Sequence, residues 1–442
     1  MALAAVPLAA VMLVDAAVLI QRATKSDAPK PAASASAHPR TTSSAQAERR
    51  TSIARAAAIS SLLARRGHAV MHHDKAEWMS TVDPAQRRFR RSQRAVFANL
   101  QQVPFASWSY TFEPDQPQIP DRQSQRYGVP SWAPSQFALH YRLRGFDPKP
   151  TNLAQFPTFV HRASGWFLAS LSDFANEGAK SSLDLWDFGP VAVLRTPSVL
   201  VLGHPGGVIS MQSLADEVAA DIPRVTAVWG RHWARRVVVL APATQRELGR
   251  VVGDFGALGH IAAVATAEVN IGSGKPDPVG DRVGINPNNW SKLSSLGREI
   301  VLTHELTHVA TRAVTSAATP TWLAEGFADY VGYLGSGVPT TFVAQELRTD
   351  VLGGRVPKTL PPDSQFDGAS KSLSQAYESA WMACRLIAQK WGQPTLVRFY
   401  NAVGRSHENP RIAVANATER VLHLSATAFF AQWRAFLRTE LA

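Results

Sequence analysis

Hydrophobic and polar positions alternate along the chain with two different periods. Apolar residues recur at three-to-four spacing over residues 52–71 and 211–229, which predicts amphipathic helices. Short alternating or apolar runs predict strands. These runs cover residues 108–112, 140–143, 159–161, 165–171, 191–194, 199–202, 236–240, 261–269 and 282–286. The pattern predicts an α+β protein.

The first fifty residues have a different character. Residues 1–20 contain no charged side chain except Asp15, which would cost about 2.5–3.5 kcal/mol at a bilayer centre. Their length suits a signal anchor or membrane segment, and an apolar N-terminal helix is the alternative. Residues 21–50 are rich in Ala, Pro, Ser and Thr, which is typical of a linker. We therefore expect a membrane-anchored or exported protein on the extracytoplasmic side.

Residues 51–187 place a helix before a series of strands. This order resembles the small cone-shaped domains of the SnoaL-like, nuclear-transport-factor-like superfold. The resemblance implies an α+β cone and leaves the role of this domain open, because that fold carries both enzymes and binding modules.

Charge and cysteine content bear on three kinds of function: nucleic-acid binding, disulfide bonding and metal binding by cysteine. The net charge is +12, but basic residues are scattered, and the run at 87–91 lacks an aromatic-interleaved stripe. We therefore expect no nucleic-acid partner. The single Cys384 excludes an intramolecular disulfide and a cysteine-based zinc site, and we expect it to be a buried thiol. His68, His72 and His73 have an unspecific spacing and are expected at the surface.

The chemistry-bearing segment is the sequence His304-Glu305-Leu306-Thr307-His308, in a helix predicted over residues 295–312. Residues four apart share one helical face, so both imidazoles can meet one metal ion. Glu305 follows His304 directly and can reach an open coordination position. Such a short motif also occurs by chance in unrelated helices, so it needs a third ligand.

Residues 322–330, Trp-Leu-Ala-Glu-Gly-Phe-Ala-Asp-Tyr, supply that ligand in Glu325. Catalytic zinc takes three protein ligands and keeps one position for water, and two histidines with one glutamate form an established set. The sequence therefore predicts one zinc ion per chain.

With this segment the chain resembles the gluzincins, the HExxH-plus-glutamate metallopeptidases of the peptidase MA clan, over residues 188–442. The resemblance implies a thermolysin-like domain, with a sheet and an active-site helix before a helical C-terminal part. It also implies that His304, His308 and Glu325 bind zinc and that Glu305 is the general base. Asp329, four residues after Glu325, corresponds to the family's acid that hydrogen-bonds a ligand histidine.

The competing metzincin pattern requires Gly and His at the third and sixth positions after the motif. Thr311 and Val314 stand there instead, so the sequence does not fit that pattern.

The expected activity is hydrolysis of peptide bonds in a peptide or protein substrate. Tyr377 is the predicted donor to the developing oxyanion, with a packed core tyrosine as the alternative. One of the strands at 261–269 and 282–286 is a candidate edge for an extended peptide. A non-catalytic peptidase-fold binding or scaffold protein at the cell surface is the alternative function. Endopeptidase and aminopeptidase activities both remain open.

Overall fold

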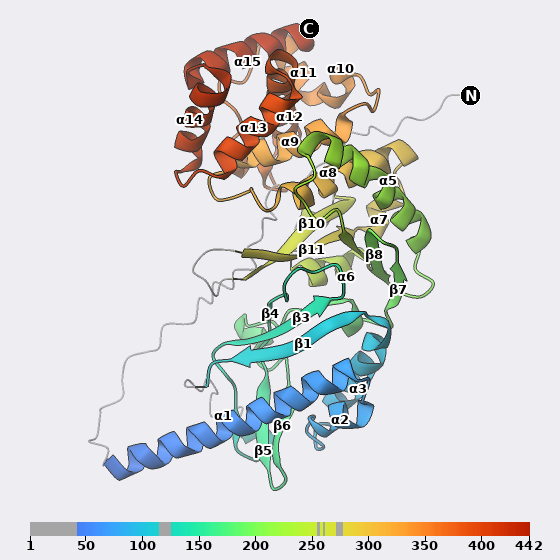
Figure 1. Ribbon diagram of the computed structural model, residues 1–442, viewed down its shortest axis with the longest axis vertical. Coiled ribbons are helices and arrows are strands. Elements are labelled where there is room, and N and C mark those ends of the chain that lie inside the picture. Colours follow the sequence, from blue (N-terminus) through green and yellow to red (C-terminus); the bar gives the residue numbers. More distant parts are fainter. Residues whose placement is uncertain (1–41, 115–124, 254–256, 260, 271–276) are drawn as a thin grey trace. The chain divides into compact units, whose positions relative to one another are not determined.

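The structure is a computed structural model, and it describes residues 42–442 except 115–124, 254–256, 260 and 271–276 (Figure 1). These residues form two compact units. The first is built mainly from residues before Val193 and the second mainly from residues after Ala192. Both helices and strands are present in each unit, so the predicted α+β class is confirmed.

Helices open the first unit. They are α1 (Thr42–Met71), α2 (Lys75–Ser80) and α3 (Arg87–Asn99), and short 3₁₀ segments follow at η2 (Leu100–Gln102), η3 (Ala175–Glu177) and η4 (Leu185–Asp187). Helix α1 begins at Thr42, so the last part of the predicted linker, residues 42–50, is helical. Helix α3 was not predicted, because the basic run at 87–91 obscures an amphipathic segment that buries Gln93 and Phe97.

Two small antiparallel sheets complete the first unit. Their strands are β1 (Phe105–Phe112), β2 (Ser131–Trp132), β3 (Phe137–Leu143), β4 (Leu153–Ala154), β5 (Thr158–Arg162) and β6 (Gly165–Ser170). One sheet has the order β1-β3-β4 and the other β2-β5-β6. Helix α1 packs against β1 and β6. Inward-facing aromatic side chains of the strands supply much of the core.

A five-stranded sheet begins the second unit. Its strands are β7 (Ala192–Arg195), β8 (Val199–Gly203), β9 (Val237–Ala241), β10 (Ala263–Asn270) and β11 (Asp277–Ile285), in the order β10-β11-β9-β8-β7. Strands β8, β9 and β11 are parallel. The near-continuous runs of buried Val and Leu in β8 and β9 are typical of strands covered on both faces. Strand β10 lies at an edge.

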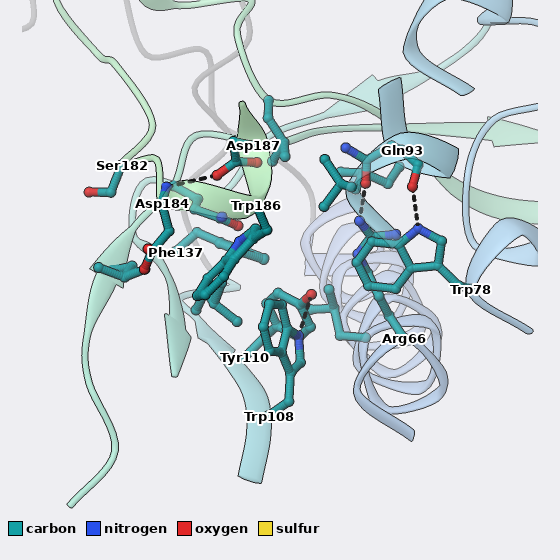
Figure 2. A pocket seen from close by; sticks show the side chains of 17 residues that line it. Arg66, Trp78, Gln93, Trp108, Tyr110, Phe137, Ser182, Asp184, Trp186 and Asp187 are labelled. Carbon is teal, nitrogen blue, oxygen red and sulfur yellow. Dashed lines mark hydrogen bonds between the residues drawn. The ribbon is translucent and has the colours of Figure 1, made fainter. Parts of the chain in front are cut away.

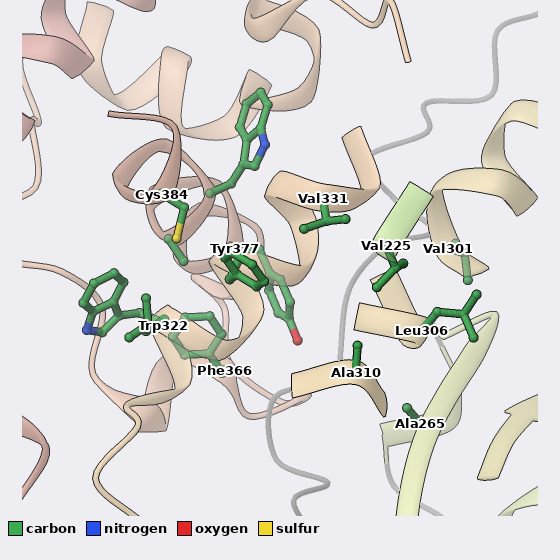
Figure 3. Packing of buried hydrophobic residues seen from close by; sticks show 14 of the residues in the cluster. Val225, Ala265, Val301, Leu306, Ala310, Trp322, Val331, Phe366, Tyr377 and Cys384 are labelled. Atoms are coloured by element: carbon green, nitrogen blue, oxygen red, sulfur yellow. The ribbon is translucent and has the colours of Figure 1, made fainter. Parts of the chain in front are cut away.

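Helices make up the rest of the second unit. They are α5 (Met211–Trp229), α6 (Gln245–Val252), α7 (Pro287–Trp290), α8 (Ser295–Thr311), α9 (Thr321–Tyr333), α10 (Thr340–Val343), α11 (Gln345–Leu352), α12 (Leu373–Trp391), α13 (Gln393–Gly404), α14 (Pro410–Leu422) and α15 (Ala426–Glu440), with 3₁₀ segments η5 (Ala257–Gly259) and η6 (Asp363–Phe366). One hydrophobic cluster joins the sheet to these helices. Cys384 of α12 is fully buried in it, as predicted (Figure 3).

The predicted membrane segment, residues 1–20, lies outside the described residues. Among the helices that the structure does describe, none is both long and apolar enough to cross a bilayer.

Helix α9 packs closely on α8 and α12. The approach to α12 is made at Gly326, where a Cβ atom would lie 2.4 Å from the carbonyl oxygen of Ala380. Real Cβ atoms do not approach backbone this closely, so glycine is required here for packing. Because Gly326 follows Glu325 directly, the same contact fixes the position of α9 against α12 at the predicted ligand.

We expect Gly326→Ala to lower the free energy of unfolding by about 1–3 kcal/mol, because α9 must move away from α12. This loss exceeds the gain of about 1 kcal/mol in helix propensity that alanine brings. Thermal and urea denaturation measure the change. Gly259→Ala is the matched control, because nothing lies within 4 Å of a Cβ atom there. Equal stability of the two variants would contradict this packing argument.

Candidate metal centre

Helix α8 carries the two motif histidines. Ser294 caps its N-terminus by accepting a hydrogen bond from the Gly297 N–H, and the helix then runs through the motif without interruption. The four-residue spacing places the imidazoles on one face, as predicted. Their Nε2 atoms lie 3.1 Å apart, and both side chains are largely buried. Two nitrogen atoms therefore converge on one point.

Glu325 of α9 completes the group. Its Oε2 atom lies 3.4 Å from His304 Nε2 and 3.5 Å from His308 Nε2. The three ligand atoms lie within 4.8 Å of one another, and this is the one set of metal-ligating side chains found among the residues that the structure describes. The structure thus brings together the three side chains that the sequence predicts as ligands.

The surroundings of Glu325 fit a cation. Its Oε2 atom is buried without a hydrogen-bond partner among the described residues, although buried carboxylate oxygens are rarely left in that state. The facing atoms are two imidazole nitrogens. Two nitrogens and one oxygen form a donor set that catalytic zinc uses. These residues therefore fit a zinc ion.

Asp329 lies one helical turn beyond Glu325 and orients the first histidine. Its Oδ1 atom is 2.8 Å from His304 Nδ1, and both groups are buried. With Nδ1 donating to this carboxylate, Nε2 of His304 is left facing Glu325 and His308. Hydrogen bonds of this kind fix the tautomer and direction of metal-binding histidines. The geometry agrees with the position that the resemblance implies for Asp329.

The electrostatics of the group are strongly coupled. Burial by itself lowers the pKa of His304, but the hydrogen bond to Asp329 and the carboxylate of Glu325 outweigh burial and raise the pKa well above its usual range. Burial likewise raises the pKa of Glu325, but the imidazoles of His308 and His304 outweigh it and lower the pKa to about 2. The raised pKa favours the protonated form of His304, so a metal ion that binds this imidazole would have to displace its proton.

Glu305, the predicted base, is buried beside this group. Its Oε2 atom accepts a hydrogen bond of 2.7 Å from the N–H of Ala265 on β10. The carbonyl of Ala265 accepts a hydrogen bond of 3.3 Å from Arg312 Nη2, and Arg312 Nε pairs with Asp281 at 3.0 Å. Both backbone groups of Ala265 are thus directed to residues at or next to helix α8. The motif helix and the edge strand are fixed to each other at this residue.

Ala265, Arg312 and Asp281 were not singled out from the sequence. Arg312 carries a usable signal, because it stands four residues after His308 and so continues the same helical face. Ala265 contributes only backbone atoms, which a sequence motif does not record. Asp281 is placed by β11, far from α8 in the chain.

Tyr377 lies on α12 inside the hydrophobic cluster (Figure 3). Its residue is only 4% exposed, and its ring packs edge-on against Phe366 with the ring centroids 5.2 Å apart. This packing agrees with the alternative of a core tyrosine, and the catalytic role stays a prediction.

The other histidine cluster, at the C-terminal end of α1 and just beyond it, has partners of its own. His68, His72 and His73 are exposed, as expected. His68 Nδ1 lies 2.6 Å from Glu77 and its ring stacks on His72, while His73 pairs with Gln101. These contacts account for the cluster without a metal ion.

Comparisons of the chain with protein-family models, curated proteins and solved structures found no match. The site geometry is therefore the basis for any functional conclusion.

We expect the purified protein to hold about one zinc ion per chain, and His304→Ala and Glu325→Ala to lose it, because each removes one of three ligands. Elemental analysis after dialysis measures the content. His407→Ala, which removes an exposed histidine of the same unit, is the control and should keep its metal. Zinc retained in both ligand variants would show that the metal binds elsewhere.

Proposed function

We propose that this protein is a zinc-dependent metallopeptidase that hydrolyses peptide bonds in a peptide or protein substrate. The observation that carries the proposal is the convergence of His304, His308 and Glu325, whose ligand atoms lie within 4.8 Å of one another. Glu305 lies next to this group in the chain and is equally buried. Two histidines, one carboxylate ligand and a second carboxylate beside them are the parts that metal-assisted hydrolysis uses.

When bound, zinc would polarise the scissile carbonyl and lower the pKa of water from 15.7 towards about 7. In this proposal the Glu305 carboxylate takes a proton from the attacking water and later gives it to the leaving amine. Its hydrogen bond from Ala265 holds the Glu305 carboxylate in place beside the histidines. Asp329 would keep His304 in the tautomer whose Nε2 lone pair can bind a cation.

The edge strand supports a peptide substrate. Strand β10 has β11 on one side only, so an extended peptide can add along its outer edge through backbone hydrogen bonds. Ala265 has already committed its N–H and carbonyl to Glu305 and Arg312. We therefore propose that a substrate strand pairs with positions flanking Ala265, which would bring its scissile bond to the base.

The finer parts of the architecture belong to the same proposal. A sheet with an active-site helix, followed by α9 to α15, is the order that a thermolysin-like domain has. The helix-then-sheet order of the first unit supports a SnoaL-like cone. We also propose that residues 1–20 tether or export the protein, which would place the peptidase on the extracytoplasmic side.

The alternative is a non-catalytic binding or scaffold protein that keeps the peptidase fold. Such proteins are expected to lose a ligand or the base. His304, Glu305, His308 and Glu325 are all present, and all but the partly exposed His308 are buried, which favours the enzyme.

We expect Glu305→Gln to lower kcat at least about 100-fold with zinc content unchanged, because glutamine cannot accept the proton. The amide oxygen can still accept the hydrogen bond from Ala265, so the fold should survive. Turnover of denatured casein and of a mixed peptide library is the measurement. Glu299→Gln, on the same helix and paired with Arg224, is the matched control and should keep full activity. Undiminished turnover in Glu305→Gln would eliminate this residue as the base.

We expect Tyr377→Phe to lower kcat about 100- to 1000-fold. Removal of a hydroxyl that donates to the oxyanion raises the activation free energy by about 2.7–4 kcal/mol. The KM and the thermal unfolding midpoint should change little. Tyr400→Phe is the comparison, because Tyr400 is also buried and bonds Thr315 through its hydroxyl. A loss of rate in Tyr400→Phe alone would indicate that Tyr400 is the oxyanion donor. Full activity in Tyr377→Phe would show that Tyr377 has a packing role only.

A further inference from the structure

Helix α3 of the first unit packs against α2 and η4 through one side (Figure 1). Phe97 is buried on that side. Gln93, one turn before it, accepts two hydrogen bonds, one from the Arg66 guanidinium to its side chain and one of 2.9 Å from Trp78 Nε1 to its carbonyl oxygen (Figure 2). This inward side therefore fixes α3 in the unit and leaves the opposite side to solvent.

Five arginines lie on this helix, and no acidic residue does. One of them, Arg90, serves the fold, because its Nη1 donates to the carbonyl oxygens of Met79 and Val82 at 3.2 and 2.9 Å. The other four are exposed, and within the described part of the chain their guanidinium groups form no hydrogen bond or ion pair. We call these four residues the basic face: Arg87, Arg88, Arg91 and Arg94.

The basic face forms one continuous stripe along α3. Arg87, Arg91 and Arg94 stand at i, i+4 and i+7, so their side chains share one side of the helix over a length of about 10 Å. Arg88 stands three residues before Arg91 and lies beside it. The other exposed residues of α3 are small and uncharged: Ser92, Ala95 and Ala98. The stripe therefore presents four positive charges without an acidic side chain among them.

This arrangement of charge disfavours the helix by itself. Like charges three and four residues apart repel each other. Arg87 and Arg88 also occupy the first turn, where the helix dipole disfavours positive charge, and Gln86 supplies no side-chain cap there. No carboxylate of the described chain pairs with the basic face to offset these costs. A surface of high negative charge density would offset them, because it compensates the whole stripe at once.

We propose that the basic face docks on a membrane surface that carries anionic phospholipids, where its guanidinium groups pair with lipid phosphates. Guanidinium donors match phosphate oxygens, and clustered basic residues on a helix are attracted to anionic lipid. Single-stranded nucleic acid requires exposed aromatic rings for stacking, whereas Phe89 and Phe97 pack inward. The proposal is independent of peptidase activity. It draws on the proposed tether at residues 1–20 only for bringing the protein to a membrane.

The test places a fluorescent dye on the basic face of the full chain. Ser92→Cys supplies an exposed thiol for the dye, while the native Cys384 is fully buried and stays unlabelled. The vesicles are phosphatidylcholine alone or mixed with phosphatidylglycerol, and both carry a nitroxide-headgroup lipid that quenches a nearby dye. We expect strong quenching on the anionic vesicles only. It should be lost at about 1 M salt, where the Debye length falls to about 3 Å.

Charge variants of the labelled chain locate the contact. The combination of Arg87→Gln, Arg91→Gln and Arg94→Gln should weaken binding of α3 to anionic vesicles about 100-fold, at about fivefold per arginine. Its thermal unfolding midpoint should stay level or rise, because mutual repulsion is removed. The matched control makes the same change in net charge at three exposed arginines of the second unit and should keep the quenching: Arg246→Gln, Arg405→Gln and Arg411→Gln.

Equal quenching on neutral and anionic vesicles, or none on either, would overturn the proposal. Undiminished quenching in the triple variant of α3 would also overturn it, because the stripe would then have no role. A dye response to a short RNA or DNA strand but not to vesicles would assign the basic face to nucleic acid and reject the lipid partner. Sedimentation of the chain with neutral vesicles measures the proposed tether separately, so a failure of the tether is distinguishable from a failure of the basic face.

Discussion

The hydrogen bond between His304 and Asp329 is the contact on which the candidate metal centre depends. It joins α8 to α9 inside the core, 2.8 Å from nitrogen to oxygen. The contact requires two helices to approach closely, and Gly332 makes this possible, because a Cβ atom there would lie 3.0 Å from the Ile300 carbonyl oxygen and 3.6 Å from the Cβ of His304. Larger residues at this position would separate the ligands.

The same close packing makes the site costly without a cation. Three carboxylates, of Glu305, Glu325 and Asp329, are buried with the imidazoles of His304 and His308. Removing these charges from water costs more than neutral hydrogen bonds return, unless the charges compensate one another. A proton on His304 provides part of the compensation, in agreement with the raised pKa of that imidazole. A divalent cation bound there would provide it more fully, because it could meet the buried Oε2 atom of Glu325.

The parts of this site that lie on a single helix could be predicted from the local sequence. The predicted helix at 295–312 agrees with α8, and its four-residue spacing is enough to bring His304 and His308 together. Helix α3 was missed because its charged face dominates a run of arginines, although Gln93 and Phe97 are buried on the other face.

Contacts between distant segments could not be read in this way. Ala265 reaches Glu305 through a backbone N–H, and no residue type encodes that role. Arg66 likewise reads as one more basic residue of an amphipathic helix, and its burial against Thr81, Gln93 and Trp78 comes from segments that follow it in the chain. The position of Tyr377 also depends on a separate segment, because its ring packs edge-on against Phe366 of η6, with the ring centroids 5.2 Å apart.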